Sequence, residues 1–355
     1  MRVGVSKQLA EHADPSTGHG RVWAATLAAL PDCVRLVPVA PRKARGRGRV
    51  DVWLADGHAG DPQVDVPVVA VVHEVGWTPA QLRGEDDSGF SQPLASQTAA
   101  GVASAAHVIA PSEASRRQVI DSCGLPPERV HSVAYGVDAG VFRPGVPGGR
   151  SLVARHSGTD ERPYLLFVGS LHPRKNLQAL REAVSGLAER GYPHVLAVVA
   201  REPEYLRGRF PRHHRKAARA ELPGGPGRVV MLPRLTDLEM AGLMAGAAAF
   251  CLPSLGEGFG LPPLEAMACG TVVIVSDRGP LPEVVGDGGL VVSPTADALE
   301  EALRGVLDRP DELAALRQCA VARARSLSWD RTARGWARVL SLAATRSLDG
   351  GSVSR

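Results

Sequence analysis

The sequence lacks most features that mark membrane, secreted and nucleic-acid-binding proteins. Its longest uncharged apolar stretch, Met240 to Leu252, is shorter than the ~18 residues that a membrane-spanning helix needs. The five cysteines include no Cys-x-x-Cys pair, which excludes the usual zinc and redox motifs. Aromatic residues make up only 4% of the chain, too few for a nucleic-acid platform. The start, MRVGVSKQ, is typical of a strand and not of a signal peptide, so we expect a cytoplasmic protein.

The formal net charge of +4 is modest, and the basic residues are concentrated in two short runs at 41–49 and 207–219. Such runs contact phosphates or an anionic membrane surface, or they remain solvated loops. Peripheral contact with the inner face of a membrane therefore stays open beside the simpler interpretation as solvated loops. No nucleic-acid partner is expected.

At ~100–200 residues per domain, a chain of 355 residues predicts two domains. Runs rich in valine and leucine alternate with helical patterns, which is typical of parallel sheets covered by helices. The predicted strands are 2–6, 34–39, 50–56, 66–72, 107–111, 130–135, 164–170, 194–200, 228–232, 249–254, 271–276 and 290–293. The predicted helices between them include 21–30, 94–106, 113–124, 177–191, 236–247 and 261–270.

A polar segment rich in glycine and proline, 146–163, predicts a linker between domains at 1–145 and 164–327. The final helix, 328–348, places Trp329 and Trp336 on one apolar face. The predicted fold class is α/β, with two Rossmann-like, doubly wound domains facing a cleft. In such domains ligands bind at the carboxyl ends of the strands.

The segment PSLGEGFGLPPLEAMACG, 253–270, carries the clearest chemical signal. It follows a predicted strand and opens a helix, and its glycines let backbone amides approach an anion. Prolines suit the first turn of a helix, whose free N–H groups and dipole favour a phosphate. Two carboxylates, Glu257 and Glu265, flank this cradle. A sugar nucleotide presents hydroxyls on both sides of its diphosphate, so one glutamate for the sugar and one for the ribose is the simplest interpretation. A helix-start or surface glutamate is the alternative.

This segment resembles the E-x7-E signature of the retaining glycosyltransferase family 4, whose members have the GT-B fold. The resemblance extends over nearly the whole chain, through FVGSLHPRKNL (167–177), 276–294, 110–144 and LSWDRTAR (327–334). In this fold the final helix crosses back to the first domain. The motifs PRKN and YGVD most resemble the mannosyltransferase-like enzymes of polysaccharide assembly.

The resemblance implies a role for each residue of the donor site. Glu257 would hold hydroxyls of the donor sugar, and Glu265 would bind the ribose. Lys175 matches the lysine that binds the donor phosphates. Arg174 would replace an arginine that many relatives carry where this chain has Ser170, unless it is merely solvated. The substrate-binding loop would comprise Gly258, Phe259, Gly260 and Leu261.

Two motifs of the first domain are also implicated. Gly18 and Gly20, in the loop TGHGR, resemble a glycine-rich turn that lies near the donor phosphates, although they also form part of a dinucleotide fingerprint. His73 follows a predicted strand and matches a histidine that approaches the donor sugar. A packed structural histidine is the alternative.

We expect a hexose to move, with retained configuration, from a GDP- or UDP-linked donor to a hydroxyl of a glycan, lipid-linked or natural-product acceptor. No Asp-x-Asp pair occurs, so no metal or other cofactor is expected. The acceptor pocket would lie on loops around 40–50 and 76–92. Two alternatives remain: a non-catalytic nucleotide-sugar-binding subunit, and an NAD(P)-dependent oxidoreductase, since Asp277 lies 19 residues beyond Gly258.

Overall fold

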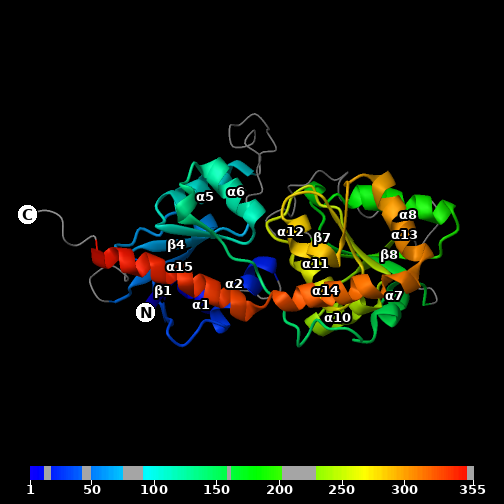
Figure 1. Ribbon diagram of the computed structural model, residues 1–355, viewed down its shortest axis with the longest axis horizontal. Helices are drawn as coiled ribbons and strands as arrows, with labels where there is room; N and C mark the ends of the chain where they lie inside the picture. The colour runs from blue at the N-terminus through cyan, green and yellow to red at the C-terminus, as the bar shows by residue number, and fades with distance from the viewer. Residues whose placement is uncertain (12–16, 42–48, 75–90, 158–160, 202–228, 350–355) are drawn as a thin grey trace, which may run out of the picture. The chain divides into compact units, whose positions relative to one another are not determined.

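The computed structural model describes residues 1–11, 17–41, 49–74, 91–157, 161–201 and 229–349 (Figure 1). The basic runs at 41–49 and 207–219 and the loop 76–92 fall almost entirely outside these ranges. The chain forms two compact units. The first combines Met1–Gly136 with Leu327–Arg355, and the second is Val137–Ser326.

The sheet of the first unit has six parallel strands in the order β2-β1-β3-β4-β5-β6. Side chains of its central strands are buried on both faces, which is why they appear in the sequence as continuous apolar runs. The strands are β1 (Arg2–Val5), β2 (Arg35–Pro38), β3 (Val52–Asp56), β4 (Val68–Val71), β5 (His107–Ala110) and β6 (Val130–Ser132).

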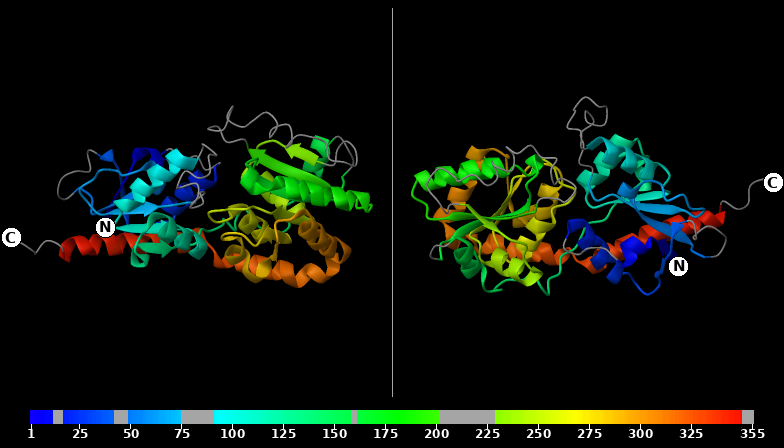
Figure 2. Two further views of the ribbon diagram at one scale, coloured as in Figure 1. Left: turned by 90° about the horizontal axis from the view of Figure 1, so that it is seen from above. Right: turned by 180° about the vertical axis from the view of Figure 1, so that it is seen from behind.

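Helices cover both faces of this sheet (Figures 1 and 2). They are α1 (Lys7–Glu11), α2 (Gly18–Ala28), α5 (Ser91–Ala103), α6 (Glu113–Cys123) and α15 (Trp329–Asp349). The last of these contacts α2, β3, β4 and β5. Its fully buried Trp336 packs edge-on against Trp23, with ring centroids 5.1 Å apart, and its Thr332 hydroxyl donates to the Ala134 carbonyl at 2.8 Å. The chain therefore returns to the first unit to complete its core.

The second unit has six parallel strands in the order β12-β11-β10-β7-β8-β9, so the direction of winding reverses between β7 and β10. Its strands are β7 (Tyr164–Ser170), β8 (Val195–Arg201), β9 (Val229–Leu232), β10 (Ala249–Leu252), β11 (Val273–Ser276) and β12 (Leu290–Val292). Its helices are α7 (Gly149–Ser157), α8 (Leu177–Glu189), α10 (Asp237–Gly246), α11 (Leu261–Ala268), α12 (Leu281–Val285), α13 (Ala296–Asp308) and α14 (Ala314–Ser326). Helices α8 and α13 pack together, and α10 packs against α7 and α11. No helix within the described residues is both long enough and apolar enough to cross a membrane.

Two local features differ from the sequence analysis. Helix α7 occupies much of the predicted linker, 146–163, and its Gly149 packs so closely on α10 that a Cβ would lie 2.5 Å from the Gly242 carbonyl oxygen. Gly18 and Gly20 were predicted in a loop, but they form the first turn of α2, which begins after the N-cap Thr17. The Thr17 hydroxyl accepts a hydrogen bond from the Gly20 amide at 2.9 Å, and this cap extends the helix over both glycines.

The close approach of Gly136 to the start of α15 generates a prediction. A Cβ at Gly136 would lie 2.2 Å from the Trp329 backbone nitrogen, so Gly136→Ala should destabilise the first unit by about 1–3 kcal/mol. All five tryptophans fall within this unit, so tryptophan fluorescence follows its unfolding. The control is Gly305→Ala in α13 of the second unit, where a Cβ meets no atom within 4 Å, and this change should leave the fluorescence midpoint unchanged. An unchanged fluorescence midpoint for Gly136→Ala would contradict this packing.

Candidate active site

The candidate site lies where the loops after β7 and β10 meet. These two strands are neighbours in the second sheet, and the order of winding reverses between them. At such a switch point the loops leaving adjacent strands separate to opposite faces and leave room for a ligand. Here a backbone hydrogen bond fixes their spacing, because the Leu255 amide donates to the Arg174 carbonyl at 2.7 Å.

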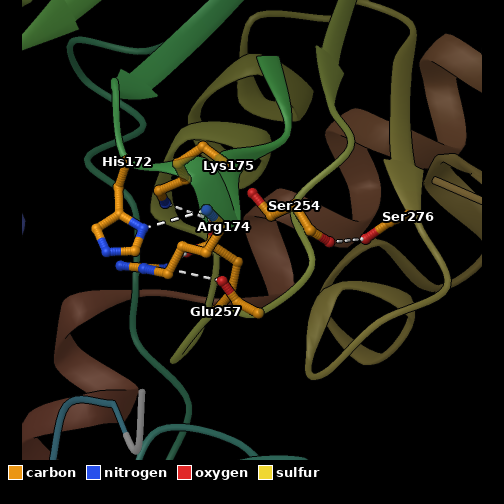
Figure 3. Close-up of polar contacts among 7 residues, drawn as sticks. His172, Arg174, Lys175, Ser254, Glu257 and Ser276 are labelled. Atoms are coloured by element: carbon orange, nitrogen blue, oxygen red, sulfur yellow. Dashed lines mark hydrogen bonds and ion pairs between the residues drawn. The ribbon is translucent and has the colours of Figure 1, made fainter. Parts of the chain in front are cut away.

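Two basic side chains of the first loop converge on one carboxylate of the second (Figure 3). Lys175 Nζ donates to Glu257 Oε1 at 2.5 Å, and Arg174 Nη1 lies 3.4 Å from Glu257 Oε2. Arg174 Nη1 also donates to the Gly256 carbonyl at 2.7 Å. The side chains of Glu257, Lys175 and Arg174 are 7%, 11% and 26% exposed, so none of them is a simple solvated charge.

The local sequence explains why the two cations point at Glu257. Residues Pro173–Lys175 form one 3₁₀ turn, which His172 caps by accepting the Arg174 amide on Nδ1 at 3.1 Å. Asn176 ends the turn in the left-handed region, with φ of 52°, a conformation that asparagine tolerates better than most residues. Its side-chain amide donates to the Pro294 carbonyl at 2.8 Å. The PRKN motif is therefore a rigid turn that presents Arg174 and Lys175 together.

The electrostatics of the cluster favour an ionised Glu257. Burial is the largest influence on the pKa of its carboxyl group and acts to raise it. The charges of Lys175 and Arg174, with hydrogen bonding by Lys175 and Ser254, outweigh burial and hold the pKa below the ordinary value of 4.5. Two cations face one carboxylate, so one positive charge remains uncompensated within this trio. That surplus suits an anionic ligand.

A pair of buried serines supports the loop that carries Glu257. The Ser276 hydroxyl, at the end of β11, donates to the Ser254 carbonyl at 2.5 Å (Figure 3). Both residues are fully buried. Neither serine stands out in the sequence, since only the order of the strands brings β10 and β11 together.

Helix α11 begins directly after this loop. Gly260 precedes it with φ of 114°, and a Cβ there would lie 2.9 Å from Leu281 Cδ2, so the position requires glycine. No side chain caps the helix, and prolines occupy its first turn. Glu265 lies one turn into α11 and is 7% exposed, while Phe259 is 5% exposed. Burial, and secondarily the charge of Glu265, raises the pKa of the neighbouring Cys269 to about 12.

The remaining candidates lie in the first unit. His73 follows β4 and is 4% exposed, with Nδ1 2.7 Å from the Tyr135 hydroxyl. Its ring contacts His19, whose centroid is 4.1 Å away. Neither His19 nor His58 was predicted as a site residue, although His58 also follows a strand end. Among the described residues, no group of three or more His, Cys, Asp or Glu side chains is arranged to hold a metal ion.

A basic cluster at the switch point of a doubly wound parallel sheet is the arrangement in which α/β proteins bind anionic ligands. Comparison with known protein families identifies the family to which the chain belongs. Residues 18–141 match the model described as Glycosyltransferase Family 4, and residues 152–323 match the model described as Glycosyl transferases group 1. The chain belongs to this family of glycosyltransferases.

Curated relatives agree with this assignment. The chain is 32% identical over 307 residues to D-inositol 3-phosphate glycosyltransferase 2 of Catenulispora acidiphila, covering 81% of this chain and 67% of that protein. It is 31% identical over 234 residues to O-antigen chain mannosyltransferase B of Escherichia coli, covering 64% of this chain and 58% of that one. It is 28% identical over 296 residues to D-inositol 3-phosphate glycosyltransferase of Segniliparus rotundus, covering 80% of this chain and only 61% of that protein.

Solved structures share the fold. Sucrose-phosphate synthase from Thermosynechococcus elongatus superposes with a TM-score of 0.70 at 18% identity, covering 99% of both chains. The Anabaena protein HepE, solved in complex with UDP-glucose, superposes with a TM-score of 0.69 at 18% identity, covering 96% of this chain and 99% of that one. The predicted fold class, an α/β protein of the GT-B type, is confirmed.

The buried ion pair makes a testable contribution to stability. Lys175→Met should destabilise the second unit by about 2–4 kcal/mol at neutral pH, because it leaves a buried carboxylate with only Arg174 to balance it. The double variant Lys175→Met/Glu257→Gln should recover part of this loss, since the buried carboxylate charge is removed and only the partly exposed Arg174 loses an ionic partner. Differential scanning calorimetry of the wild type and the variants measures both effects.

The pH dependence of this loss follows from the lowered pKa of Glu257. Ionised Glu257 stabilises the wild type above the ordinary carboxyl pKa of 4.5, and this contribution disappears as the pH falls through the lower pKa of the folded state. The difference between wild type and Lys175→Met should therefore be full at pH 7 and shrink in acid. A difference that did not change with pH would contradict the ion pair.

Proposed function

We propose that this chain is a retaining, metal-independent glycosyltransferase that moves a hexose from a nucleoside-diphosphate sugar to an acceptor hydroxyl. The observation that carries the proposal is the convergence of Lys175 and Arg174 on Glu257 at the switch point of the second sheet. A cluster with surplus positive charge beside the start of α11 is suited to a diphosphate, and a carboxylate beside it is suited to hydroxyls. A sugar nucleotide presents both groups.

The cations would act on the leaving group. When the bond between the anomeric carbon and the phosphate oxygen breaks, its electron pair remains on that oxygen and the diphosphate gains charge. Lys175 and Arg174 are placed to stabilise this charge, together with the loop amides of Phe259 and Gly260 and the positive end of the α11 dipole. The acceptor oxygen bonds to the anomeric carbon from the same face, and its proton passes to the departing phosphate oxygen, so no separate protein base is needed.

The glutamates would hold the donor. A carboxylate has about four acceptor positions, so Glu257 can keep both ion pairs and still accept hydroxyls of the sugar. Glu265 would accept the ribose hydroxyls, with Gly258, Phe259, Gly260 and Leu261 forming the intervening loop. From the first unit, His73, Gly18 and Gly20 are assigned to the donor sugar and phosphates by the family resemblance.

The relatives suggest the substrate class. One is named for mannose transfer to O-antigen, others for D-inositol 3-phosphate, and a structural neighbour was solved with UDP-glucose. We therefore propose a hexose donor linked to UDP or GDP, and a glycan, lipid-linked or natural-product acceptor. The cytoplasm, with peripheral contact at the inner membrane face through the basic runs, is the proposed location. The family match does not favour the oxidoreductase alternative, and Asp277 is 45% exposed and paired with Arg278 at 3.1 Å.

A donor screen tests this function directly. The protein is incubated with UDP- and GDP-linked hexoses, with and without candidate acceptors, and the released nucleoside diphosphate is measured. At least one donor should be turned over. Calorimetry with the matching nucleoside diphosphate should show that Glu265→Gln weakens binding about 10- to 100-fold, since a hydrogen bond to a charged group contributes ~1.5–3 kcal/mol.

Each outcome of this experiment has a distinct meaning. Tight nucleotide binding without release from any donor would favour the non-catalytic binding subunit over the enzyme. Unchanged nucleotide affinity in Glu265→Gln would remove Glu265 from the ribose role. The control Glu301→Gln changes a glutamate of the outer helix α13 and should leave both measurements unchanged.

Metal independence has its own test. Turnover of the best donor should survive an excess of chelator, because Lys175, Arg174 and the amides of the loop before α11 would stabilise the leaving group without a divalent ion. The released diphosphate is measured before and after chelation, and again after manganese or magnesium is added. Activity that chelation abolishes and metal restores would refute this part of the proposal.

A further inference from the structure

The first unit contains a cluster of three imidazoles at the carboxyl edge of its sheet. His19 lies in the first turn of α2, His58 in the 3₁₀ turn after β3, and His73 directly after β4. Their ring centroids are 4.1 Å apart for His19 and His73, 5.5 Å for His19 and His58, and 6.1 Å for His58 and His73. His73 is 4% exposed and His58 is 9% exposed, so two of the three rings are taken out of water.

His58 fixes the backbone of His73. The His73 amide donates to His58 Nε2 at 3.2 Å, so this nitrogen accepts and carries no proton. The proton of a neutral His58 is then on Nδ1, which lies 2.8 Å from the Thr98 hydroxyl. Burial lowers the pKa of His58, which favours this neutral form. The hydrogen bonds of His58 therefore hold the chain at His73 in one position.

Tyr135 fixes the side chain of His73. Its hydroxyl lies 2.7 Å from His73 Nδ1, and the two residues are 62 positions apart in the sequence. Burial, followed by the charges of Asp56 and Glu74, raises the pKa of Tyr135 well above its usual value, so it stays a phenol. Burial, followed by the neighbouring histidines, lowers the pKa of His73 well below 6.5, so it stays neutral.

The direction of this hydrogen bond decides what His73 can do. In a neutral pair a phenol is the stronger donor and an imidazole nitrogen the stronger acceptor, so the Tyr135 hydroxyl donates to Nδ1. The single proton of His73 is then on Nε2, because the partner of one ring nitrogen determines the state of the other. His73 Nε2 is buried and has no hydrogen-bond partner among the described residues. A buried polar nitrogen without a partner is costly unless a ligand supplies one.

We propose that Tyr135, the first residue of the YGVD motif, is a positioning residue that holds His73 as the Nε2–H tautomer, so that His73 donates a hydrogen bond to an oxygen of the bound donor. This inference rests on the proposed function, in which His73 contacts the donor. It adds that the contact is a neutral N–H donor, suited to a sugar hydroxyl or a phosphate oxygen. It also explains why a residue with a hydroxyl group occupies the first position of the YGVD motif.

Nitrogen-15 NMR of histidine-labelled protein tests the tautomer without any need for turnover. The signals of His73 are assigned by their loss in His73→Gln. In the wild type, Nε2 should be protonated and Nδ1 bare. In Tyr135→Phe, which removes only the hydroxyl, the His73 signals should shift towards a mixture of tautomers. Protonated Nδ1 in the wild type, or an unchanged tautomer in Tyr135→Phe, would overturn the inference.

Kinetics with the best donor provide the second measurement. Tyr135→Phe should lower kcat/KM for the donor roughly 10- to 100-fold, by analogy with the loss of partners that orient metal-ligating histidines. The double variant Tyr135→Phe/His73→Gln should be no slower than His73→Gln alone, because both changes act on the same hydrogen bond to the donor. Additive losses would overturn the inference, since they would mean that Tyr135 acts independently of His73.

Tyr164→Phe is the matched control. It removes another buried phenol hydroxyl, which donates to the Leu243 carbonyl at 2.6 Å in the second unit, and should change neither the His73 signals nor the kinetics. The two hypotheses can fail separately. If turnover occurs but the tautomer does not respond to Tyr135→Phe, only the positioning role is wrong. If the tautomer responds but no donor is turned over, the proposed function is wrong, while the positioning of His73 by Tyr135 stands.

Discussion

The buried ion pair between Lys175 and Glu257 is the interaction on which the candidate site depends. It joins two loops whose residues are 82 positions apart, and Arg174 reinforces it from the same turn. A buried carboxylate is stable only when it is paired, so the ion pair acts with the Leu255–Arg174 backbone hydrogen bond to hold together the loops after β7 and β10. The order of the strands therefore determines which two loops can meet, and the pairing of opposite charges determines how these loops are held.

The sequence was sufficient to predict the two sheets, because parallel strands buried on both faces appear as runs of valine and leucine. It was also sufficient to place Arg174, Lys175 and Glu257 each at the end of a strand. The contact between them depends on β7 lying beside β10, and strand order is not encoded locally. Helix α7 was missed because glycines and prolines surround its short apolar stretch, Leu152 and Val153, and the tight packing at Gly149 involves residues that are distant in sequence.

In the first unit, too, contacts between distant residues could not be predicted from the sequence, as His73 shows. Its position after an apolar strand was evident, and YGVD was recognised as a motif, but the contact between His73 and Tyr135 joins two separate strand ends. The loop predicted around Gly18 and Gly20 was instead a helical turn, because the hydroxyl of Thr17 caps it one turn earlier than the apolar pattern begins. Caps and side-chain partners thus explain most of what the sequence pattern could not provide.

The return of the chain to the first unit has a consequence for synthesis on the ribosome. Residues 1–136 emerge first, but α15, which contacts β3, β4 and β5, is made only after Val137–Ser326. The second unit is continuous in sequence and can fold as soon as it emerges. Until α15 has been made, the nascent first unit lacks the buried Trp336 and exposes the apolar surface that α15 will cover. The unit that is started first is therefore the last to be completed.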